Sequence, residues 1–398
     1  MAARLLPRIG LGVAGLLLAA LAVSVNLGLQ KLDDLDTPGA LALMPWGAAA
    51  NAAAAEDALR ASQYAEAERL SVRSLDRTLL NVKALRTLAL AREARDAEDR
   101  MVLPAMLLAG QLGWRDTPTQ YWLMITGLRA GVYPVALQRA DALLRRDQNM
   151  GEVFSILRLA ATDPAVRKVI VETLVTRPDW RLALFQARST SAGEADGMEA
   201  IVRALQKTAA PPTRRELWYY LDGLVRTRDY DRAYRIWSVS LNDRETGWPH
   251  DPVFTKAAAV AAESADQMPF EWTFRTEQGD APRFGPQGGI TLDGNYERIA
   301  DFVAQTIHLP PGPHRLLVDI SGRRDQLNVL QWKVACLPMR KQLLGSPTVA
   351  AAGKTFVTGF DFVIPPQDCA YQRLSLTISP PVESGNISMT INKVSITG

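Results

Sequence analysis

The sequence predicts a multidomain protein with an N-terminal transmembrane helix, an α-helical repeat domain and a C-terminal antiparallel β-sandwich. Three motifs place an aromatic residue three positions before an alanine, each between two amphipathic helical patterns: Tyr64–Ala67, Tyr133–Ala136 and Tyr230–Ala233. The first two tyrosines are 69 residues apart, close to twice the roughly 34 residues of a helical-hairpin unit. Before these motifs the chain has a long uncharged run, and at Pro269 the apolar period changes from 3.6 to 2.

The uncharged run Ile9–Leu29 is the predicted transmembrane helix. Its 21 residues would span about 32 Å, enough for a bilayer core. Arg4 and Arg8 precede it, and the acids that follow are Asp33, Asp34 and Asp36. The positive-inside rule therefore predicts a single-pass inner-membrane protein, with residues 1–8 in the cytoplasm and the bulk in the periplasm. A cleaved signal peptide, ending near Ala22-Val23-Ser24, is the alternative.

Composition excludes several functions. The chain has 398 residues, 47% of them hydrophobic, and a net charge of only +3, which does not suit a nucleic-acid binder. Three histidines and two cysteines leave little material for a metal site or a catalytic triad. We therefore expect neither a metal, a cofactor nor catalytic residues, and we expect a protein that is not an enzyme.

Residues 30–47 carry Asp, Pro and Gly without a sustained period, and we expect a linker there. From residue 48 the pattern is helical, and we assign the helical domain to 48–265. It resembles tetratricopeptide repeats, which consist of two antiparallel helices and recruit proteins through a groove. The repeat-like units are 48–81, 82–115, 117–150 and 214–247, of which the second is degenerate, with Glu98 and Met101 at the aromatic and alanine positions.

Between the third and fourth units the sequence still reads as helical. Pro164 and Pro178 are expected to begin helices, since proline is favoured in the first turn. Ser189–Gly197 is expected to be a loop, and Pro211-Pro212-Thr213 to open the next helix.

Residues 268–398 are assigned to the β-sandwich, because short runs of period 2 alternate there with proline and glycine clusters. The expected strands are Phe270–Phe274, Leu316–Ile320, Leu330–Cys336, Phe360–Ile364, Leu374–Ile378, Ile387–Ile391 and Ile391–Ile396. The domain is similar to jelly-roll modules, many of which bind carbohydrate. Trp272 and Trp332 are in phase with apolar neighbours and are expected in its core.

Cys336 and Cys369 both fall in this domain. In an exported chain, two cysteines on neighbouring strand patterns favour a disulfide. Two buried free thiols are the alternative.

A binding groove is expected on the first helix of each hairpin, as in tetratricopeptide arrays. The residues at these positions are Tyr121, Ile125, Arg129, Trp218, Asp222 and Arg226. Aromatic, arginine and carboxylate side chains together suit a protein segment. The alternative is that these residues pack against a neighbouring helix or the sandwich.

A possible glycan contact lies at Asp293, Asn295 and Tyr296, where one aromatic face stands beside hydrogen-bonding side chains. An ordinary polar loop explains the same residues. Taken together, the chain resembles accessory proteins of bacterial envelope and exopolysaccharide assembly. The expected function is a membrane-anchored periplasmic scaffold that binds protein partners of the cell envelope. A carbohydrate-binding protein that uses the sandwich to hold polysaccharide is the alternative.

Overall fold

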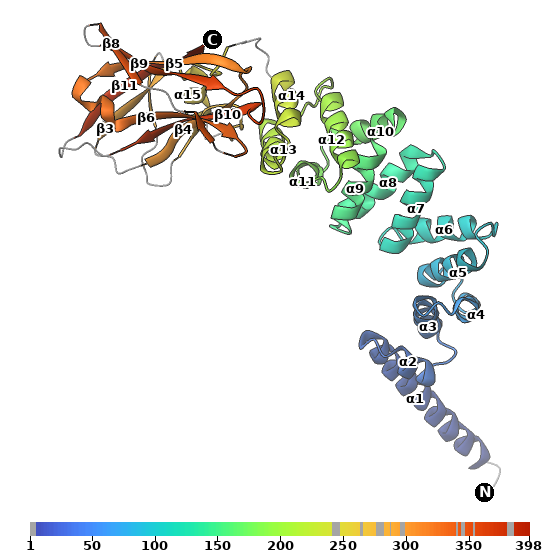
Figure 1. The fold of residues 1–398 in the computed structure, drawn as a ribbon. Helices are drawn as coiled ribbons and strands as arrows, with labels where there is room; N and C mark the ends of the chain where they lie inside the picture. Colours follow the sequence, from blue (N-terminus) through green and yellow to red (C-terminus); the bar gives the residue numbers. More distant parts are fainter. Residues whose placement is uncertain are drawn as a thin grey trace. The chain divides into compact units, whose positions relative to one another are not determined.

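The computed structural model describes the chain except residues 1–4, 241–246, 263–265, 276–281, 287, 295–298, 340, 344–346, 353–354 and 380–385. The chain forms two compact units, Met1–Thr173 and Leu174–Gly398. Figure 1 labels the helices and strands of each. We refer to them as unit 1 and unit 2.

Unit 1 begins with helix α1, Leu5–Asp33. Its stretch Ala14–Asp33 is long and apolar enough to cross a membrane, and a signal sequence would pass the same test. The expected linker is not irregular, because it contains helix α2, Thr37–Leu43. The Asp36 side chain accepts a hydrogen bond from the Gly39 amide and caps this helix. Ala40 and Met44 are buried in a small apolar cluster with Ala50, so this segment packs against its neighbours in the chain.

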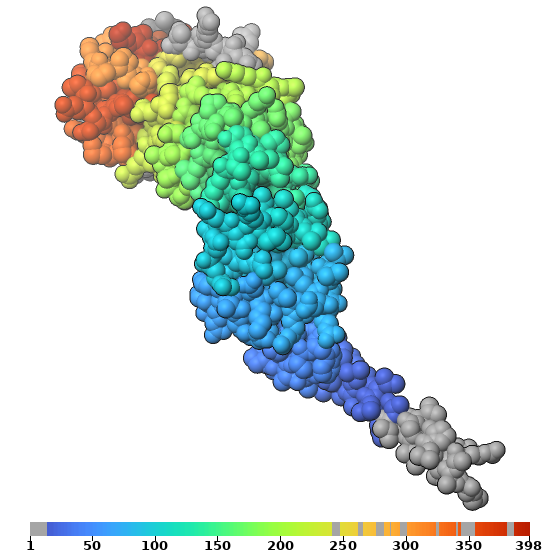
Figure 2. Space-filling model, turned by 90° about the vertical axis from the view of Figure 1, so that its right-hand side faces the viewer, coloured from blue at the N-terminus to red at the C-terminus, as the bar shows by residue number. Residues whose placement is uncertain are grey.

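The three repeat units predicted in unit 1 are three helical hairpins. Their helices are α3 (Ala48–Arg60), α4 (Tyr64–Leu75), α5 (Val82–Arg95), α6 (Val102–Leu112), α7 (Thr117–Arg129) and α8 (Tyr133–Leu144). The alanines predicted to pack, Ala67 and Ala136, are fully buried. A Cβ built on Gly127 would lie 3.1 Å from the Ala136 Cβ, so the small pair lets α7 and α8 approach closely. Figure 2 shows these residues as successive bands of colour, because each hairpin stacks on its neighbours in sequence.

Arg86 links these hairpins through two ion pairs. Its side chain is buried, and its guanidinium donates to Glu56 of α3 and to Asp116, the residue that caps α7. Glu56 and Asp116 each lie 30 residues from Arg86, on the preceding and following hairpins.

Helices α9 (Met150–Ala160) and α10 (Pro164–Val175) follow. Pro164 begins α10 as predicted. The prediction for Pro178 was wrong, because α11 begins three residues later and spans Arg181–Gln186. The prediction of a loop over Ser189–Gly197 was also wrong beyond Ser191, which caps helix α12, Ala192–Leu205.

The fourth predicted unit is the hairpin of α13 (Arg214–Arg226) and α14 (Tyr230–Ser240). Thr213 opens α13 as predicted, through a capping box with Glu216. Ala233 is fully buried, like its counterparts in unit 1.

The C-terminal part contains two antiparallel sheets. The strands are β1 (Thr273–Phe274), β2 (Arg283–Gly285), β3 (Gly288–Gly294), β4 (Ile299–Ile307), β5 (Gly312–Gly322), β6 (Leu330–Leu337), β7 (Lys341–Leu343), β8 (Pro347–Ala352), β9 (Thr355–Ile364), β10 (Tyr371–Ile378) and β11 (Ile387–Thr397). One sheet has the order β1-β4-β10-β6-β7 and the other β2-β3-β11-β5-β9-β8. The predicted fold class, a helical repeat followed by a β-sandwich, is therefore confirmed. The first expected strand is shorter than predicted, since only Thr273 and Phe274 pair with β4.

One apolar core joins the two sheets. Trp272 is buried there and donates its indole N–H to the Asp251 carbonyl, and Trp332 packs against the same core. Phe254 and Ala257 belong to this core as well, and they lie at and within helix α15, Thr255–Ala262. Phe254 and helix α15, which the sequence analysis assigned to the helical repeat, thus pack with the sandwich.

The predicted disulfide is confirmed. Cys336 and Cys369 are bonded, with their Cα atoms 4.8 Å apart, and join the end of β6 to the turn before β10. Both are almost fully buried. Closing a loop of 33 residues stabilises the fold by about 3.5–4 kcal/mol on the chain-entropy model.

Within unit 2, helix α14 packs on the sandwich through aromatic rings. Tyr230 stacks on Tyr371 of β10 at 5.5 Å between centroids, and Tyr234 contacts Phe270 at 5.5 Å. The Tyr371 hydroxyl donates to Asp231 at 2.8 Å. Burial, followed by this hydrogen bond, raises the pKa of Tyr371. We call this set the α14–sandwich joint; its rings are those of Tyr230, Tyr234, Trp237, Trp248, Phe270, His308 and Tyr371.

Candidate functional site

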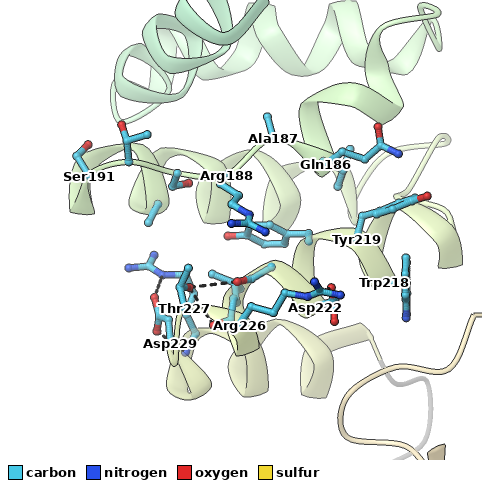
Figure 3. A pocket seen from close by; sticks show the side chains of 18 of the residues that line it. Gln186, Ala187, Arg188, Ser191, Trp218, Tyr219, Asp222, Arg226, Thr227 and Asp229 are labelled. Atoms are coloured by element: carbon cyan, nitrogen blue, oxygen red, sulfur yellow. Dashed lines mark hydrogen bonds and ion pairs between the residues drawn. The ribbon is translucent and has the colours of Figure 1, made fainter. Parts of the chain in front are cut away.

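A pocket of about 590 Å³ lies in unit 2 between the chain around α11 and α12 and one face of α13. Figure 3 shows its two walls, with residues of 186–191 on one side and of α13 on the other. We call it the α13 pocket. Its volume falls within the roughly 300–1,000 Å³ of typical ligand sites.

The α13 wall carries three of the predicted groove residues. Trp218, Asp222 and Arg226 are spaced four residues apart, so they share one face of the helix, and all three line the pocket. The Arg226 Nε lies 2.6 Å from an Asp222 carboxylate oxygen. Arg226 is mostly exposed, so this ion pair orients the two side chains but adds little stability.

Tyr219 widens the aromatic surface beside Trp218. The two rings meet edge to face, with centroids 4.7 Å apart. The Arg215 guanidinium lies 5.9 Å from the centre of the Tyr219 ring. Hydrogen bonds from Arg215 and then from Gln186 lower the pKa of the Tyr219 hydroxyl. Tyr219 therefore joins the two walls at one end of the pocket.

The opposite wall is polar and carries an available positive charge. Arg188 is exposed and lines the pocket, and Figure 3 shows it extending from its backbone toward α13. In the described part of the chain, Arg188 has no carboxylate partner, whereas Arg226 is paired with Asp222 and Arg232 with Asp229. The neighbouring hydroxyl residues are Ser189, Thr190 and Ser191. Arg188 is thus available to pair with a carboxylate or carbonyl group of a ligand.

The floor is apolar. Phe185 of α11 and Leu224 of α13 are buried and line the pocket from below its polar rim. Gly223 also lines the pocket, and a Cβ built there meets no atom within 4 Å. A side chain at this position would therefore point into open space, which makes Gly223 a suitable place for a probe.

The hollowed surface continues past Trp218. A second hollow of about 490 Å³ shares Trp218 and Asp222 with the α13 pocket and is also lined by Phe274 and Arg373 of the sandwich. The two hollows form one elongated surface over α13. An elongated surface suits an extended chain segment more than a compact small molecule.

A buried ion pair holds the two walls together. Arg181 of α11 and Glu216 of α13 form two hydrogen bonds of 2.8 and 2.9 Å, and both side chains are almost fully buried. Arg181 also donates to the carbonyls of Leu174, Ala210 and Pro211. This network fixes α11 against the start of α13. On the other side of the pocket, Arg232 bridges acids of α12 and the α13–α14 turn: Asp196, Glu199 and Asp229.

The other predicted groove residues lie on α7 in unit 1. The Tyr121 hydroxyl donates to Glu152 at 2.5 Å, and burial together with this hydrogen bond raises the pKa of Tyr121 to about 12. Ile125 is half-buried and Arg129 is exposed. These three residues share a helix face but line none of the pockets that we describe, so the assignment of this trio stays a prediction.

Of the three residues in the predicted glycan contact, only Asp293 belongs to the described part of the chain. Asp293 is an exposed residue of β3 opposite Ser388 of β11. Asn295 and Tyr296 lie outside the described residues. No group of three or more His, Cys, Asp or Glu side chains placed to hold a metal ion occurs in the part of the chain that the structure describes.

Sequence reasoning did not find Arg188, Tyr219 or Gly223. Arg188 comes directly before the segment assigned to a loop, so nothing in the local pattern linked it to α13. Tyr219 was visible as the neighbour of Trp218, but its position one residue on placed it outside the expected groove face. Gly223 carried a weak signal, because a glycine inside an amphipathic helix needs a reason.

The fold and the pocket define a helical-repeat protein with a C-terminal β-sandwich. No family model matches the sequence, and no curated protein matches it. Among solved structures, one match is a tetratricopeptide repeat protein from Parabacteroides merdae, with 16% sequence identity. It covers 56% of this chain and 95% of that chain, with a TM-score of 0.29. A TM-score this low carries no argument about function.

Proposed function

We propose that this protein is a non-enzymatic scaffold, anchored in the membrane of a bacterial cell envelope, that holds a segment of a partner protein in the α13 pocket. The segment would carry a large apolar side chain for the Trp218–Tyr219 surface and an acidic group for Arg188. Assembly or export of envelope polysaccharide is the process in which we place this scaffold.

The observation that carries the proposal is the make-up of the α13 pocket. Tryptophan and arginine dominate protein interfaces because they combine large contact area with directional contacts. Here Trp218 and Arg226 stand on one helix face, half-open to solvent, over the buried floor of Phe185 and Leu224. Arg188 adds an uncompensated charge on the facing wall, which favours an acidic partner segment.

Two features support a place outside the cytoplasm. The apolar run Ile9–Leu29 within helix α1 is preceded by Arg4 and Arg8 and followed by acidic residues, which favours a cytoplasmic N-terminus. The Cys336–Cys369 disulfide is typical of chains that fold in an oxidising compartment. An alkaline phosphatase fused after Gly398 should therefore be active, and activity only of a cytoplasmic reporter would refute this location.

The binding proposal can be tested with a photo-crosslinking amino acid at Gly223, where the structure leaves open space. The full chain should capture one polypeptide of defined mass in the cell. Trp218→Ala with Arg226→Ala should reduce this capture at least tenfold, because both changes remove contact area from the same wall. Circular dichroism should show an unchanged fold.

The matched control is Trp46→Ala with Arg60→Ala in unit 1. Trp46 is also a partly exposed tryptophan, and Arg60 also forms an exposed ion pair within one helix, with Asp57. This variant should capture the partner as the wild type does. Equal capture by the pocket variant and the wild type would overturn the proposal. Retention on a glycan array that Asp293→Ala abolishes, with the pocket variant unaffected, would favour the carbohydrate-binding alternative instead.

A further inference from the structure

Helix α1 has two sections with different surroundings. In the first, every residue of Ala14–Val23 is exposed, although all of them are apolar or glycine. In the second, α2 lies alongside the helix, as Figure 1 shows. The Ser24 hydroxyl donates to the Leu43 carbonyl at the end of α2, and a Cβ built on Gly28 would lie 2.8 Å from the Met44 Cγ. The missing side chain of Gly28 thus lets the end of α2 lie against α1.

The turn from α2 to α3, residues 44–47, is therefore level with Ser24–Gly28 of α1; we call it the α2–α3 turn. Its backbone is not helical, and Trp46 is 46% exposed on it. At Gly47, where α3 begins, no side chain caps the first amides of the helix, so these amides need water or another polar partner. Irregular backbone that faces lipid does not occur within the hydrocarbon layer of a membrane. Where α1 crosses a membrane, its section from Ser24 onward thus lies outside that layer.

The section before Ser24 is short for a membrane span. Arg8 is the last charged residue before it, and the 15 residues of Ile9–Val23 reach about 22 Å as a helix. A hydrocarbon core is roughly 30 Å thick. A span that is shorter than the core thins the bilayer and draws its flanking residues toward the interface. No spare length of α1 therefore remains to hold the α2–α3 turn clear of the membrane.

The residues around the α2–α3 turn suit the boundary between lipid and water. The stretch Thr37–Ala55, which includes α2 and the turn, carries no Asp, Glu, Lys or Arg, so no charge would lose its water there. Tryptophan is enriched at the headgroup level of membranes, because its ring is apolar and its indole N–H is polar. The charged residues that precede this stretch lie near the opposite end of α2: Lys31, Asp33, Asp34 and Asp36.

We propose that the α2–α3 turn rests in the headgroup layer of the membrane that α1 crosses, with the ring of Trp46 inserted between the lipids. The hydrocarbon span of α1 then ends at Val23 rather than at Leu29. The bilayer is the occupant of this surface because α1, which enters the bilayer, continues directly into the section that packs with α2. This inference rests on the membrane anchor of the proposed function and not on the α13 pocket. A helix alone would let unit 1 swing about its anchor, and a second contact at Trp46 limits that motion.

Two cysteines on α1 test where the span ends. Both native cysteines form the disulfide, so a cysteine introduced elsewhere is the one free thiol of the full chain. Leu21 and Leu29 are a matched pair, because they lie on the same helix and are 45% and 46% exposed. In intact cells with a permeable outer membrane, a membrane-impermeant maleimide should label Leu29→Cys at least tenfold faster than Leu21→Cys. The reason is that a thiol in hydrocarbon does not form the reactive thiolate.

Each other outcome of the labelling has a definite meaning. Failure to label Leu29→Cys would place this residue in hydrocarbon and overturn the end of the span at Val23. Equal labelling of both variants, in a chain that stays in the membrane fraction, would overturn it too. Loss of the chain from the membrane fraction would refute the anchor of the proposed function, and this inference with it. Capture through the α13 pocket is a separate measurement, and the control variant with Trp46→Ala should retain it, since α1 alone keeps the chain in the membrane.

Brominated lipids test the place of Trp46. The full chain is reconstituted in vesicles of phosphatidylcholine that carries bromine on its acyl chains near the headgroup, where bromine quenches tryptophan fluorescence. Trp46→Phe should lose at least half of the fluorescence intensity that this lipid quenches in the wild type, and Trp114→Phe should keep nearly all of it. Trp114 is the matched control, because it is a tryptophan of unit 1 that is 43% exposed. A Trp46→Phe variant in which the lipid quenches as much fluorescence as in the wild type overturns the insertion of Trp46.

Discussion

Removal of Arg181 should destabilise unit 2 far more than removal of an exposed arginine. Arg181→Met would delete two hydrogen bonds to Glu216 and three to backbone carbonyls, all in a nearly solvent-free site. The Glu216 carboxylate would then remain buried without its cation. Breaking a buried pair in this way costs about 3–5 kcal/mol.

The assay is urea unfolding of the full chain, followed by circular dichroism. With a slope of about 2 kcal/mol per molar urea, a loss of ~4 kcal/mol lowers the midpoint of the unit 2 transition by roughly 2 M. Arg226→Ala is the control, because the Arg226–Asp222 pair is exposed and worth about 0–1 kcal/mol. Its midpoint should move by less than about 0.5 M.

A second variant separates the buried charge from lost packing. Glu216→Gln combined with Arg181→Met removes the orphaned carboxylate, while a glutamine at this position can still complete the capping box with Thr213. This double variant should recover a substantial part of the lost stability. If Arg181→Met behaves like Arg226→Ala, or if the double variant is no better than the single one, the reasoning about the pocket's framework is wrong.

The remaining predictions concern packing and the disulfide. Ala136→Leu and Ala233→Leu should each destabilise by about 1–3 kcal/mol through overpacking, because both alanines are fully buried and Ala136 lies against Gly127; unchanged melting temperatures in both would contradict the hairpin assignment. Cys336→Ser with Cys369→Ser should lower the stability of the sandwich by about 3.5–4 kcal/mol and leave the far-ultraviolet helix signal of unit 1 intact; recovery of two free thiols from the freshly isolated wild type would show that the bond does not form.

The helical hairpins could be predicted from the sequence because their signals are local. The aromatic–alanine motif and the 3.6 period both operate within one hairpin, and each of the predicted units, 48–81, 82–115, 117–150 and 214–247, contains a pair of helices. Two segments were misjudged although they carried helix-capping signals. Asp36-Thr37-Pro38 opens α2, and Ser191 with Glu194 opens α12, but polar composition dominated the interpretation of both.

The pocket could not be predicted in full because its walls meet through non-local packing. Arg188 and Trp218 line one pocket only because α11 lies against α13, and the contact that fixes those helices joins residues 35 apart. Sequence periodicity gave the face of α13 but not what stands opposite it. Similarly, the sequence analysis missed β2, β3, β4, β7 and β8, since strands in a sandwich are defined by pairing partners that can be far away in the chain.

The α14–sandwich joint determines how the helical part of unit 2 ends. A stack of hairpins ordinarily closes with a helix whose outer side is polar, because that side faces water. Helix α14 instead turns Tyr230, Tyr234 and Trp237 toward the sandwich, and Tyr371 supplies both a ring and a hydroxyl to meet them. The sandwich therefore covers the side of α14 that would otherwise face water. A protease cut between α14 and the sandwich would leave both pieces with bare aromatic surfaces, so they should stay together until denatured, and each should aggregate when made alone.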